Sequence, residues 1–347
     1  MADTFGANDN SAGDLNNPAK YFDICTYTGN GGTQTITEFA FQPDVWWEKT
    51  RSMTNSHHLV DAIRGGGEVL LVDAAVSNYT SPSFGLTFTS NGVTFTEIGS
   101  YTANSTNQPY VGMAWDAGTA EATASTDGSV TPTAQWVNAT AGFSLSEVEK
   151  SSGAQTYGHG LGKEPHFMII KNYDTTDAWI VYNKVRGSKY FFLHNELAEF
   201  SDTPSAFGNN DDDVFELVIG LFNSGTHVCY TWTAIPGYSA FGSYHGNVNA
   251  DGPWCYCGFQ PGLIMARSVS GSRDWLMWDT ERGTTNGALR PNVSNGELTG
   301  NATSIDIVSN GFKIKTTYTN MNANEEHVWA AWAEHPQKTA RGRMIIP

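Results

Sequence analysis

One pattern of residues occurs three times along the chain with identical spacing, and it constrains the fold more than any other feature. Each copy begins at a proline, reaches a basic residue six positions later and an Asp or Asn twelve positions after that. An Arg-Gly step follows three positions further on. The copies are Pro43, Lys49, Asp61, Arg64 and Gly65; Pro165, Lys171, Asn183, Arg186 and Gly187; and Pro261, Arg267, Asp279, Arg282 and Gly283. Three gapless matches of this length predict three copies of one structural unit.

The sequence around these positions alternates apolar and polar residues over short runs, which is typical of β-strands. The turn sequences Ser90-Asn91-Gly92 and Ser309-Asn310-Gly311 each lie between two such runs and predict hairpins. No segment has the apolar spacing of a long helix. We therefore expect an all-β fold of three tandem β-sandwich, jelly-roll-like units. A unit of roughly 100 residues is large enough to bury its own core.

The repeats also set the expected domain boundaries. An Ala-, Thr- and Ser-rich stretch before the second copy predicts a connector that packs through Trp136. The Asn-rich N-terminus has few apolar residues and no core of its own, and both it and the basic C-terminus are expected to make assembly contacts. The predicted segments are an arm (1–20), unit 1 (21–116), a connector (117–142), unit 2 (143–236), unit 3 (237–337) and a basic tail (338–347).

Composition and charge exclude several classes of function. Only 16% of the 347 residues are charged and the formal net charge is −16, so neither nucleic acid nor an anionic membrane is an expected partner. No apolar run is long enough to span a bilayer. The start of the chain, Met1-Ala2-Asp3-Thr4, resembles no secretory signal. With 12% aromatic residues, this balance is typical of a rigid particle-surface protein, and we expect a virion component made in the host cytoplasm.

The repeated basic, acidic and Arg-Gly positions have a structural and a catalytic interpretation. A catalytic constellation of Lys49, Asp61 and Arg64 would be incomplete in the other copies, because Asp61 corresponds to Asn183 and Lys49 to Arg267. The structural interpretation places the basic residue and the Asp or Asn on neighbouring strands, where they pair with each other. The Arg-Gly step then ends a strand with a turn or bulge. We prefer the structural interpretation, with no catalytic, cofactor or metal residues.

Other residues that could carry chemistry have simpler explanations. Their spacing matches no metal site, no Ca²⁺ loop and no marked pair of catalytic carboxylates, and the closing tryptophans fit a core. A cation at the acidic run is left open. These residues are the free cysteines Cys25, Cys229, Cys255 and Cys257; the acidic run Asp211, Asp212 and Asp213; the histidines His57, His58, His159 and His166; the acids Asp23, Glu38, Asp116 and Glu147; and the tryptophans Trp115, Trp232 and Trp332.

Several phrases of the sequence resemble a known family. They are residues 27–32 (Tyr-Thr-Gly-Asn-Gly-Gly), 41–44 (Phe-Gln-Pro-Asp), 158–165 (Gly-His-Gly-Leu-Gly-Lys-Glu-Pro), 237–244 (Gly-Tyr-Ser-Ala-Phe-Gly-Ser-Tyr) and 331–336 (Ala-Trp-Ala-Glu-His-Pro). They are similar to tandem-repeat proteins of tailed phages that infect cyanobacteria and other marine bacteria, which are usually labelled virion structural or tail proteins. The resemblance implies no catalytic residues. Trp46-Trp47-Glu48 departs from the aliphatic strand of the second copy and is expected to mark a contact surface of the first unit.

These observations predict a non-enzymatic virion protein. A tail fibre or adhesin subunit that contributes to host-surface recognition is the first interpretation. A capsid or tail decoration or scaffold subunit and a polysaccharide depolymerase are the alternatives. The expected partners are other virion proteins and a host-surface glycan, with assembly as a homo-oligomer. Specificity is expected in the loops that differ between copies, namely 51–56, 74–84, 196–213 and 284–300.

Overall fold

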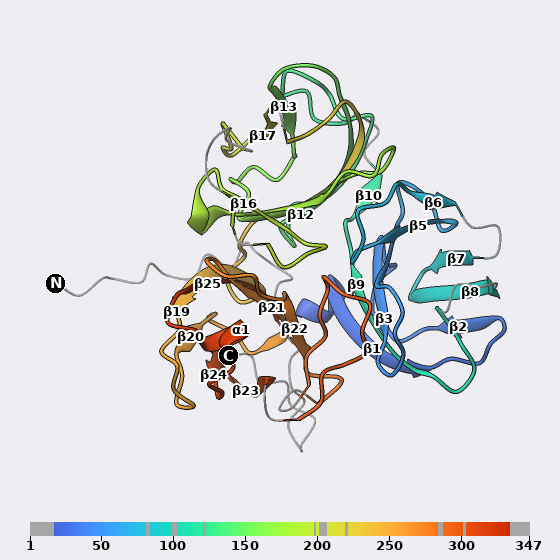
Figure 1. Ribbon diagram of the computed structural model, residues 1–347. Coiled ribbons are helices and arrows are strands. Elements are labelled where there is room, and N and C mark those ends of the chain that lie inside the picture. The colour runs from blue at the N-terminus through green and yellow to red at the C-terminus, as the bar shows by residue number, and fades with distance from the viewer. Residues whose placement is uncertain are drawn as a thin grey trace.

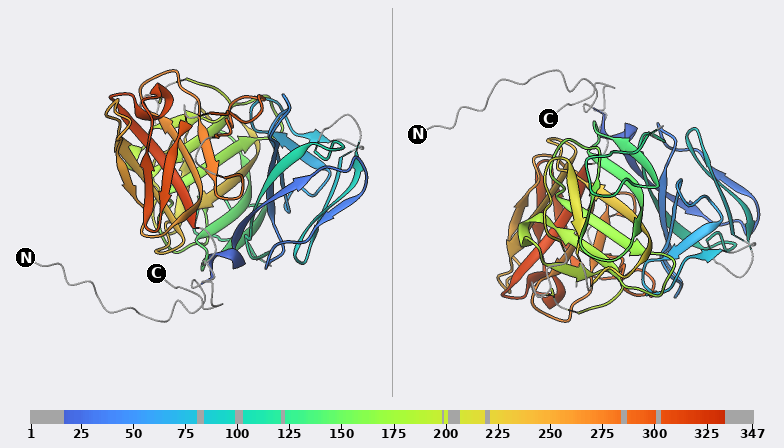
Figure 2. Two further views of the ribbon diagram at one scale, coloured as in Figure 1. Left: turned by 90° about the horizontal axis from the view of Figure 1, so that it is seen from below. Right: turned by 90° about the horizontal axis from the view of Figure 1, so that it is seen from above.

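The computed structural model is all-β, with many antiparallel sheets, as the sequence predicts. It describes residues 17–80, 84–98, 103–120, 123–197, 199–200, 207–218, 221–283, 287–300 and 303–333. Most of the expected N-terminal arm and all of the basic tail lie outside these residues. Figure 1 shows the blue, green and orange-red parts of the chain grouped around a common centre, and the two views in Figure 2 show all three parts in contact. Within the described residues, no helix has the length and apolar character needed to cross a membrane.

The first part of the chain forms a larger sheet and a smaller outer sheet. The larger sheet has the order β1-β9-β3-β4-β5-β6, and the outer sheet has the order β2-β8-β7. A short 3-10 helix, η1 (Pro18–Lys20), precedes β1. The strands are β1 (Phe22–Thr28), β2 (Gln34–Ile36), β3 (Val45–Thr50), β4 (His58–Asp61), β5 (Glu68–Leu71), β6 (Tyr79–Thr80), β7 (Phe84–Thr89), β8 (Gly92–Ile98) and β9 (Pro109–Trp115). The predicted hairpin at residues 90–92 is confirmed, because Thr89 pairs with Gly92.

The middle part has the larger sheet β10-β11-β12-β18-β14-β15-β16 and the outer pair β13-β17. Residues expected to form the connector supply β10 and β11, and β11 pairs along its whole length with β12. A 3-10 turn, η2 (Lys184–Arg186), follows β15. The strands are β10 (Thr119–Ala120), β11 (Ala134–Asn138), β12 (Phe143–Lys150), β13 (Gln155–Gly158), β14 (Phe167–Asn172), β15 (Trp179–Asn183), β16 (Tyr190–Phe192), β17 (Val214–Leu217) and β18 (Gly225–Trp232).

The last part has the larger sheet β19-β25-β21-β22 and the outer sheet β20-β24-β23. The predicted hairpin at residues 309–311 is confirmed, because Val308 pairs with Gly311. The elements are β19 (Ser239–His245), β20 (Trp254–Tyr256), β21 (Pro261–Ser268), β22 (Leu276–Asp279), β23 (Ile305–Val308), β24 (Gly311–Ile314), the helical turn α1 (Thr319–Asn322) and β25 (Glu326–Ala333).

The three larger sheets contain the same series of four strands. The first strand pairs with the last, the last pairs with the strand that carries the repeated basic residue, and that strand pairs with the one that ends in Asp or Asn. The series are β1-β9-β3-β4, β12-β18-β14-β15 and β19-β25-β21-β22. Each repeated proline lies just before or at the start of the third strand, a position where its missing N–H breaks no ladder bond.

The strand that carries the repeated basic residue is buried along its whole length in each larger sheet, because both of its faces are covered. In β25, Val328, Ala330 and Trp332 belong to a hydrophobic cluster shared by all three sheets. The alternate residues Trp329 and Ala331 face the outer sheet of their own part and belong to a separate cluster. The first and middle parts have matching separate clusters. The expectation that each unit buries its own core therefore describes half of the packing, because the largest cluster is common to all three.

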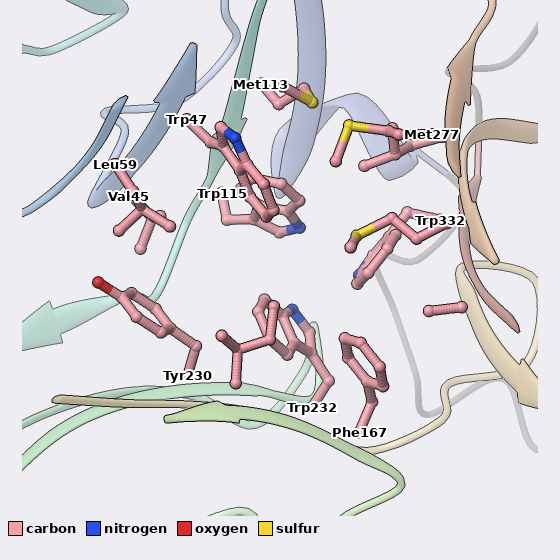
Figure 3. Packing of buried hydrophobic residues seen from close by; sticks show 14 of the residues in the cluster. Val45, Trp47, Leu59, Met113, Trp115, Phe167, Tyr230, Trp232, Met277 and Trp332 are labelled. Carbon is pink, nitrogen blue, oxygen red and sulfur yellow. The ribbon is translucent and has the colours of Figure 1, made fainter. Parts of the chain in front are cut away.

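Three tryptophans meet at the centre of the shared cluster. Trp115, Trp232 and Trp332 are 2%, 3% and 1% exposed, which confirms their predicted place in a core. The three pairs of ring centroids are 5.6–6.1 Å apart, and the planes are inclined by 64–76°. Figure 3 shows the three rings approaching one another from different parts of the chain. Edge-to-face contact is the arrangement that the aromatic quadrupole favours, and it binds the last strand of each series to the other two.

Replacing Trp332 with Ala should lower the free energy of unfolding by about 3–5 kcal/mol, because a buried ring that touches both other tryptophans is lost. Since the cluster is shared, backbone hydrogen exchange should accelerate in β9 and β18 as well as in β25. Hydrogen exchange with mass spectrometry measures this directly. Trp254→Ala is the matched control, because its ring is half exposed. Acceleration confined to residues 239–333 would contradict a shared core.

Candidate functional site

The repeated Asp or Asn closes the turn that follows its strand. Asp61 Oδ1 accepts the backbone N–H of Arg64 at 3.0 Å, and Asp279 Oδ1 accepts that of Arg282 at 2.8 Å. In the middle sheet, Asn183 Oδ1 accepts the N–H of Val185 at 3.2 Å. An amide oxygen can replace a carboxylate in this role, which explains the exchange of Asp for Asn.

The glycine of each Arg-Gly step lies in the turn with a positive φ, which costs other residues energy. The values are 85° at Gly65, 62° at Gly187 and 79° at Gly283. The Arg-Gly step therefore ends the fourth strand with a turn, the kind of ending that the sequence suggests.

The repeated basic residue does not pair with the Asp or Asn, so that part of the structural interpretation is wrong. In the strand register Asp61 lies opposite Val45, at the other end of the strand pair from Lys49. Lys49 Nζ instead donates to the backbone oxygens of Thr50 and Met53, at 2.9 and 3.1 Å. The basic residue thus holds the loop that follows its own strand.

The basic residues of the other two copies also bind backbone oxygens after their own strands, and Arg267 in addition reaches carbonyls of the middle part. Lys171 Nζ donates to the backbone oxygens of Asn172, Thr175 and Asp177, and Arg267 donates to those of Ser268, Phe192, Glu196, Leu197 and Arg273. Burial lowers the pKa of Lys49 and of Lys171 to about 8, and that of Arg267 to about 10. No carboxylate of the described residues lies at bonding distance from these three side chains. Several backbone carbonyl groups converge on each of them instead and stabilise its positive charge.

The repeated arginine of each part binds a residue that contacts a different part of the chain. We call these residues, Asn78, Glu199 and Glu297, the joining residues. Arg64 Nη1 donates to Asn78 Oδ1 at 3.0 Å, and Arg186 Nε donates to Glu199 Oε1 at 2.6 Å. Arg282 Nη1 lies 3.3 Å from a carboxylate oxygen of Glu297. Arg64 and Arg282 also pair with Asp61 and Asp279, with all four side chains at most 2% exposed.

The backbone N–H of each joining residue donates a hydrogen bond to a backbone carbonyl in another part of the chain. That carbonyl belongs to the second residue after the repeated basic residue of the other part. The bonds are Asn78 to Tyr173 at 2.7 Å, Glu199 to Val269 at 2.9 Å and Glu297 to Arg51 at 2.7 Å. They run from the first part to the second, from the second to the third and from the third back to the first. The repeated pattern therefore encodes a closed set of three equivalent junctions, which sequence reasoning missed because no partner is visible in one dimension.

All four loops expected to carry specificity contribute residues to these junctions, while the described residues 207–213 of the third loop pack within the middle part. Asn78 belongs to the loop 74–84, and Glu199, with the carbonyls of Glu196 and Leu197, belongs to 196–213. Loops 51–56 and 284–300 face each other, where Asn55 N–H bonds Ser294 O and Arg51 pairs with Glu297. Residues 81–83, 198, 201–206 and 284–286 lie outside the described residues.

The acidic run and the histidines that the sequence offered as candidates make structural hydrogen bonds within the protein. Asp211 Oδ1 accepts the N–H groups of Asp213 and Val214, which lowers the pKa of Asp211, and Asp212 accepts that of Glu164. His159 accepts the N–H of Leu161, and His166 contacts Thr233. Among the described residues, no three His, Cys, Asp or Glu side chains gather as a metal site would require.

Trp46, Trp47 and Glu48 are at most 2% exposed, so they form no solvent-facing contact surface, although Trp47 belongs to the cluster through which the first part packs on the other two. Trp46 packs over Gly112, whose missing side chain makes room for the indole, since a Cβ there would lie 2.0 Å from the ring. Glu48 accepts bonds from Tyr27 and Trp46 at 2.8 and 3.0 Å, and His58 lies at 3.1 Å. The departure is a buried polar network peculiar to the first part.

The exposed aromatic residues gather on β20, at the edge of the outer sheet of the third part. Trp254 is 51% exposed and Tyr256 is 62% exposed, while Cys255 between them is buried. Because strand side chains alternate, both rings share the solvent face. Their centroids are 5.7 Å apart and their planes are inclined by 60°. We call Trp254 and Tyr256 the aromatic platform.

The same positions in the other outer sheets carry no large ring. The buried pair Cys255–Phe312 corresponds to Ile36–Val93 in the first part and Tyr157–Phe215 in the second. By this register, Thr35 and Thr37 take the places of the platform residues in the first part, and Thr156 and Gly158 take them in the second. The platform is therefore not required by the fold. Alternation around Cys255 predicts from the sequence that Trp254 and Tyr256 point to the same side of the strand. Only the structure, with β20 at the edge of its sheet, shows that this side faces solvent.

Charged residues border the platform in opposite pairs. Trp254 lies opposite Lys313 in the strand register, and Lys313 lies opposite Asp306. Lys313 Nζ is 2.5 Å from Asp251 Oδ1, and this bond lowers the pKa of Asp251. Lys315 Nζ is 3.8 Å from Asp306 Oδ2. The border thus offers both donors and acceptors with no excess charge.

Residues 17–336 match a family described as Domain of unknown function (DUF7483). The chain belongs to the DUF7483 family. No curated protein matches it. The DUF7483 match runs through all three larger sheets and their outer sheets.

The DUF7483 junctions predict unequal effects of two arginine substitutions. Arg282→Met leaves the buried Asp279 without its counter-charge and should lower the free energy of unfolding by about 3–5 kcal/mol. Arg186→Met should cost less, because Glu326 is 36% exposed and can be solvated, and Glu199, although only 8% exposed, keeps Lys189 at 3.6 Å as a counter-charge. Urea unfolding measures both. Adding Asp279→Asn to Arg282→Met should recover part of the loss. Equal losses at the two arginines would contradict the role of burial.

Asp44 in the DUF7483 chain should make stability depend on pH. Burial raises its pKa from 3.8 to about 7, against the bond that it accepts from the N–H of Ala117. Between about pH 4 and pH 7, the Asp44 carboxyl keeps its proton in the folded protein and loses it in the unfolded chain. The contribution is therefore complete below about pH 4 and is lost as the pH rises through about 7. Asp44→Asn should flatten the dependence measured by urea unfolding between these values. An unchanged slope, equal to that of the exposed control Asp306→Asn, would refute the assignment.

Proposed function

We propose that the chain is three copies of one β-sandwich unit closed into a ring, and that it serves as a non-enzymatic structural protein of a tailed-phage virion. The identical series of four strands and the cyclic set of junction bonds support the threefold arrangement. The phage assignment is supported by the resemblance of the phrases quoted above. Three sandwiches with a common core form a rigid body suited to a particle surface.

Within the virion, the proposed role is that of a tail fibre or adhesin subunit that contributes to host-surface recognition. The observation that carries this role is the aromatic platform. Two half-exposed rings on an edge strand are costly to leave in water and are not required by the fold. Aromatic faces beside paired charges match the chemistry of a sugar, which presents apolar C–H faces and hydroxyl groups.

A decoration or scaffold subunit without receptor binding is the second candidate. It is favoured by the loops that differ between copies, because each of them supplies residues to the junctions. If the platform binds another virion protein instead of a glycan, this alternative is the better description.

Depolymerase chemistry receives less support. Among the described carboxyls, burial raises the pKa of Asp44 and Asp116, as a catalytic acid would require. Both carboxyls, however, accept bonds from the backbone N–H groups of residues 117 and 118. Glu147 is engaged by Tyr173 and Thr133. A pocket lined by Asp23 and Glu281 has space for about one water molecule, which is too small for a polysaccharide.

A glycan array prepared from host-surface polysaccharides tests the adhesin role. The protein should bind a subset of these glycans, and Trp254→Thr should weaken the signal about tenfold, roughly 1.4 kcal/mol. Thr is the residue that the chain itself places at the equivalent positions 35 and 156, so the fold should tolerate it. Thr35→Ala is the matched control and should bind as the parent does. Absence of any glycan signal, together with the protein's presence in purified particles, would favour the decoration role.

A further inference from the structure

The geometry of the aromatic platform points to one class of ligand. We propose that Trp254 and Tyr256 bind a neutral polysaccharide by stacking on two neighbouring pyranose rings whose planes are turned relative to each other. This inference rests on the proposed function, because it specifies the glycan that the adhesin role requires.

The ring spacing sets the size of the contact. Residues i and i+2 of one strand project from the same face about 6.6–6.8 Å apart, and here the ring centroids are 5.7 Å apart. That separation is comparable to the length of one sugar unit in a chain. Each ring can therefore stack on its own pyranose, so two successive sugars are held at once.

The inclination of the rings selects the shape of the chain. A flat ribbon such as cellulose presents coplanar sugar faces and would touch one ring fully and the other only by its edge. The planes of Trp254 and Tyr256 are inclined by 60°. A chain with a curved or helical path turns successive sugars by comparable amounts and can satisfy both rings.

The neighbouring backbone leaves space beside Tyr256. Gly311 lies directly opposite Tyr256 in the strand register. A Cβ at Gly311 would lie 2.0 Å from the carbonyl oxygen of Cys255, so close packing of the strands requires glycine there. As a result, the residue directly opposite Tyr256 has no side chain to cover its ring, which favours access of a sugar from that side.

The charge around the platform argues against an acidic polysaccharide. Lys313 and Lys315 are the described cations that border it, and each already has a carboxylate partner. A sulfated or uronic acid chain would meet lysines whose charge is already balanced by a carboxylate and would approach a protein of formal net charge −16. Sugar hydroxyls, in contrast, can accept from the lysines and donate to Asp251, whose side chain is 74% exposed, without breaking either pair.

Affinity electrophoresis of the full chain through gels that contain soluble polysaccharides tests this proposal. Laminarin, a neutral β-1,3-glucan with a helical path, should retard the protein, whereas alginate and carrageenan should not. A pull-down on microcrystalline cellulose tests the flat chain and should recover at least tenfold less protein. Trp254→Thr and Tyr256→Thr should each weaken retardation by laminarin about tenfold, while Thr35→Ala should leave it unchanged.

The outcomes separate this inference from the proposed function. Retardation by alginate or carrageenan alone, or preferred binding to cellulose, would overturn the ligand class and leave the adhesin role in place. Retardation by laminarin that survives both substitutions would overturn the assignment to the platform. If none of these polysaccharides binds but sedimentation shows self-association that Trp254→Thr abolishes, the platform joins two copies of the chain and the inference is wrong. A failure of the adhesin role itself would appear as an empty glycan array.

Discussion

The contact among Trp115, Trp232 and Trp332 is the constraint on which the arrangement of the whole chain depends. Each ring comes from the strand that closes a four-strand series, so the meeting of three side chains fixes the position of three sheets. The indole N–H groups of all three have no hydrogen-bond partner among the described residues. A buried donor without a partner costs about 1–3 kcal/mol, and the ring area removed from water and the edge-to-face contacts must outweigh that cost.

The repeated polar residues act at the periphery of the same arrangement. The basic residue shapes a loop by binding its carbonyl groups, and the loop offers one carbonyl to a neighbouring part. The arginine of the neighbouring part orients the residue that donates to this carbonyl. Each junction needs both the loop carbonyl that the basic residue positions and the donor that the arginine positions. This shared need explains why the basic residue and the Arg-Gly step keep their spacing in all three copies.

Local features of the fold were predictable from the sequence, and contacts between distant segments were not. Alternation and the turn at Ser309-Asn310-Gly311 predict strands and a hairpin because these depend on neighbours in the chain. Lys49 was expected to bind Asp61 because both are polar and repeated, but strand register separates them. Trp46 and Trp254 look alike in sequence. One is fully buried and the other is half exposed, because β3 lies inside a large sheet and β20 lies at an edge.

The uniqueness of Trp254 and Tyr256 among three equivalent positions has a consequence for valency. A ring of three identical chains would carry three such surfaces, whereas this single chain carries one and is free to vary the other two. If the chain serves as the proposed adhesin, attachment through one site per chain would gain strength only when several chains on the same particle engage together. Their effective concentration then depends on how the particle spaces them. Under the proposed adhesin role, individual contacts could thus stay weak and reversible, and attachment would become firm only when many of them form together.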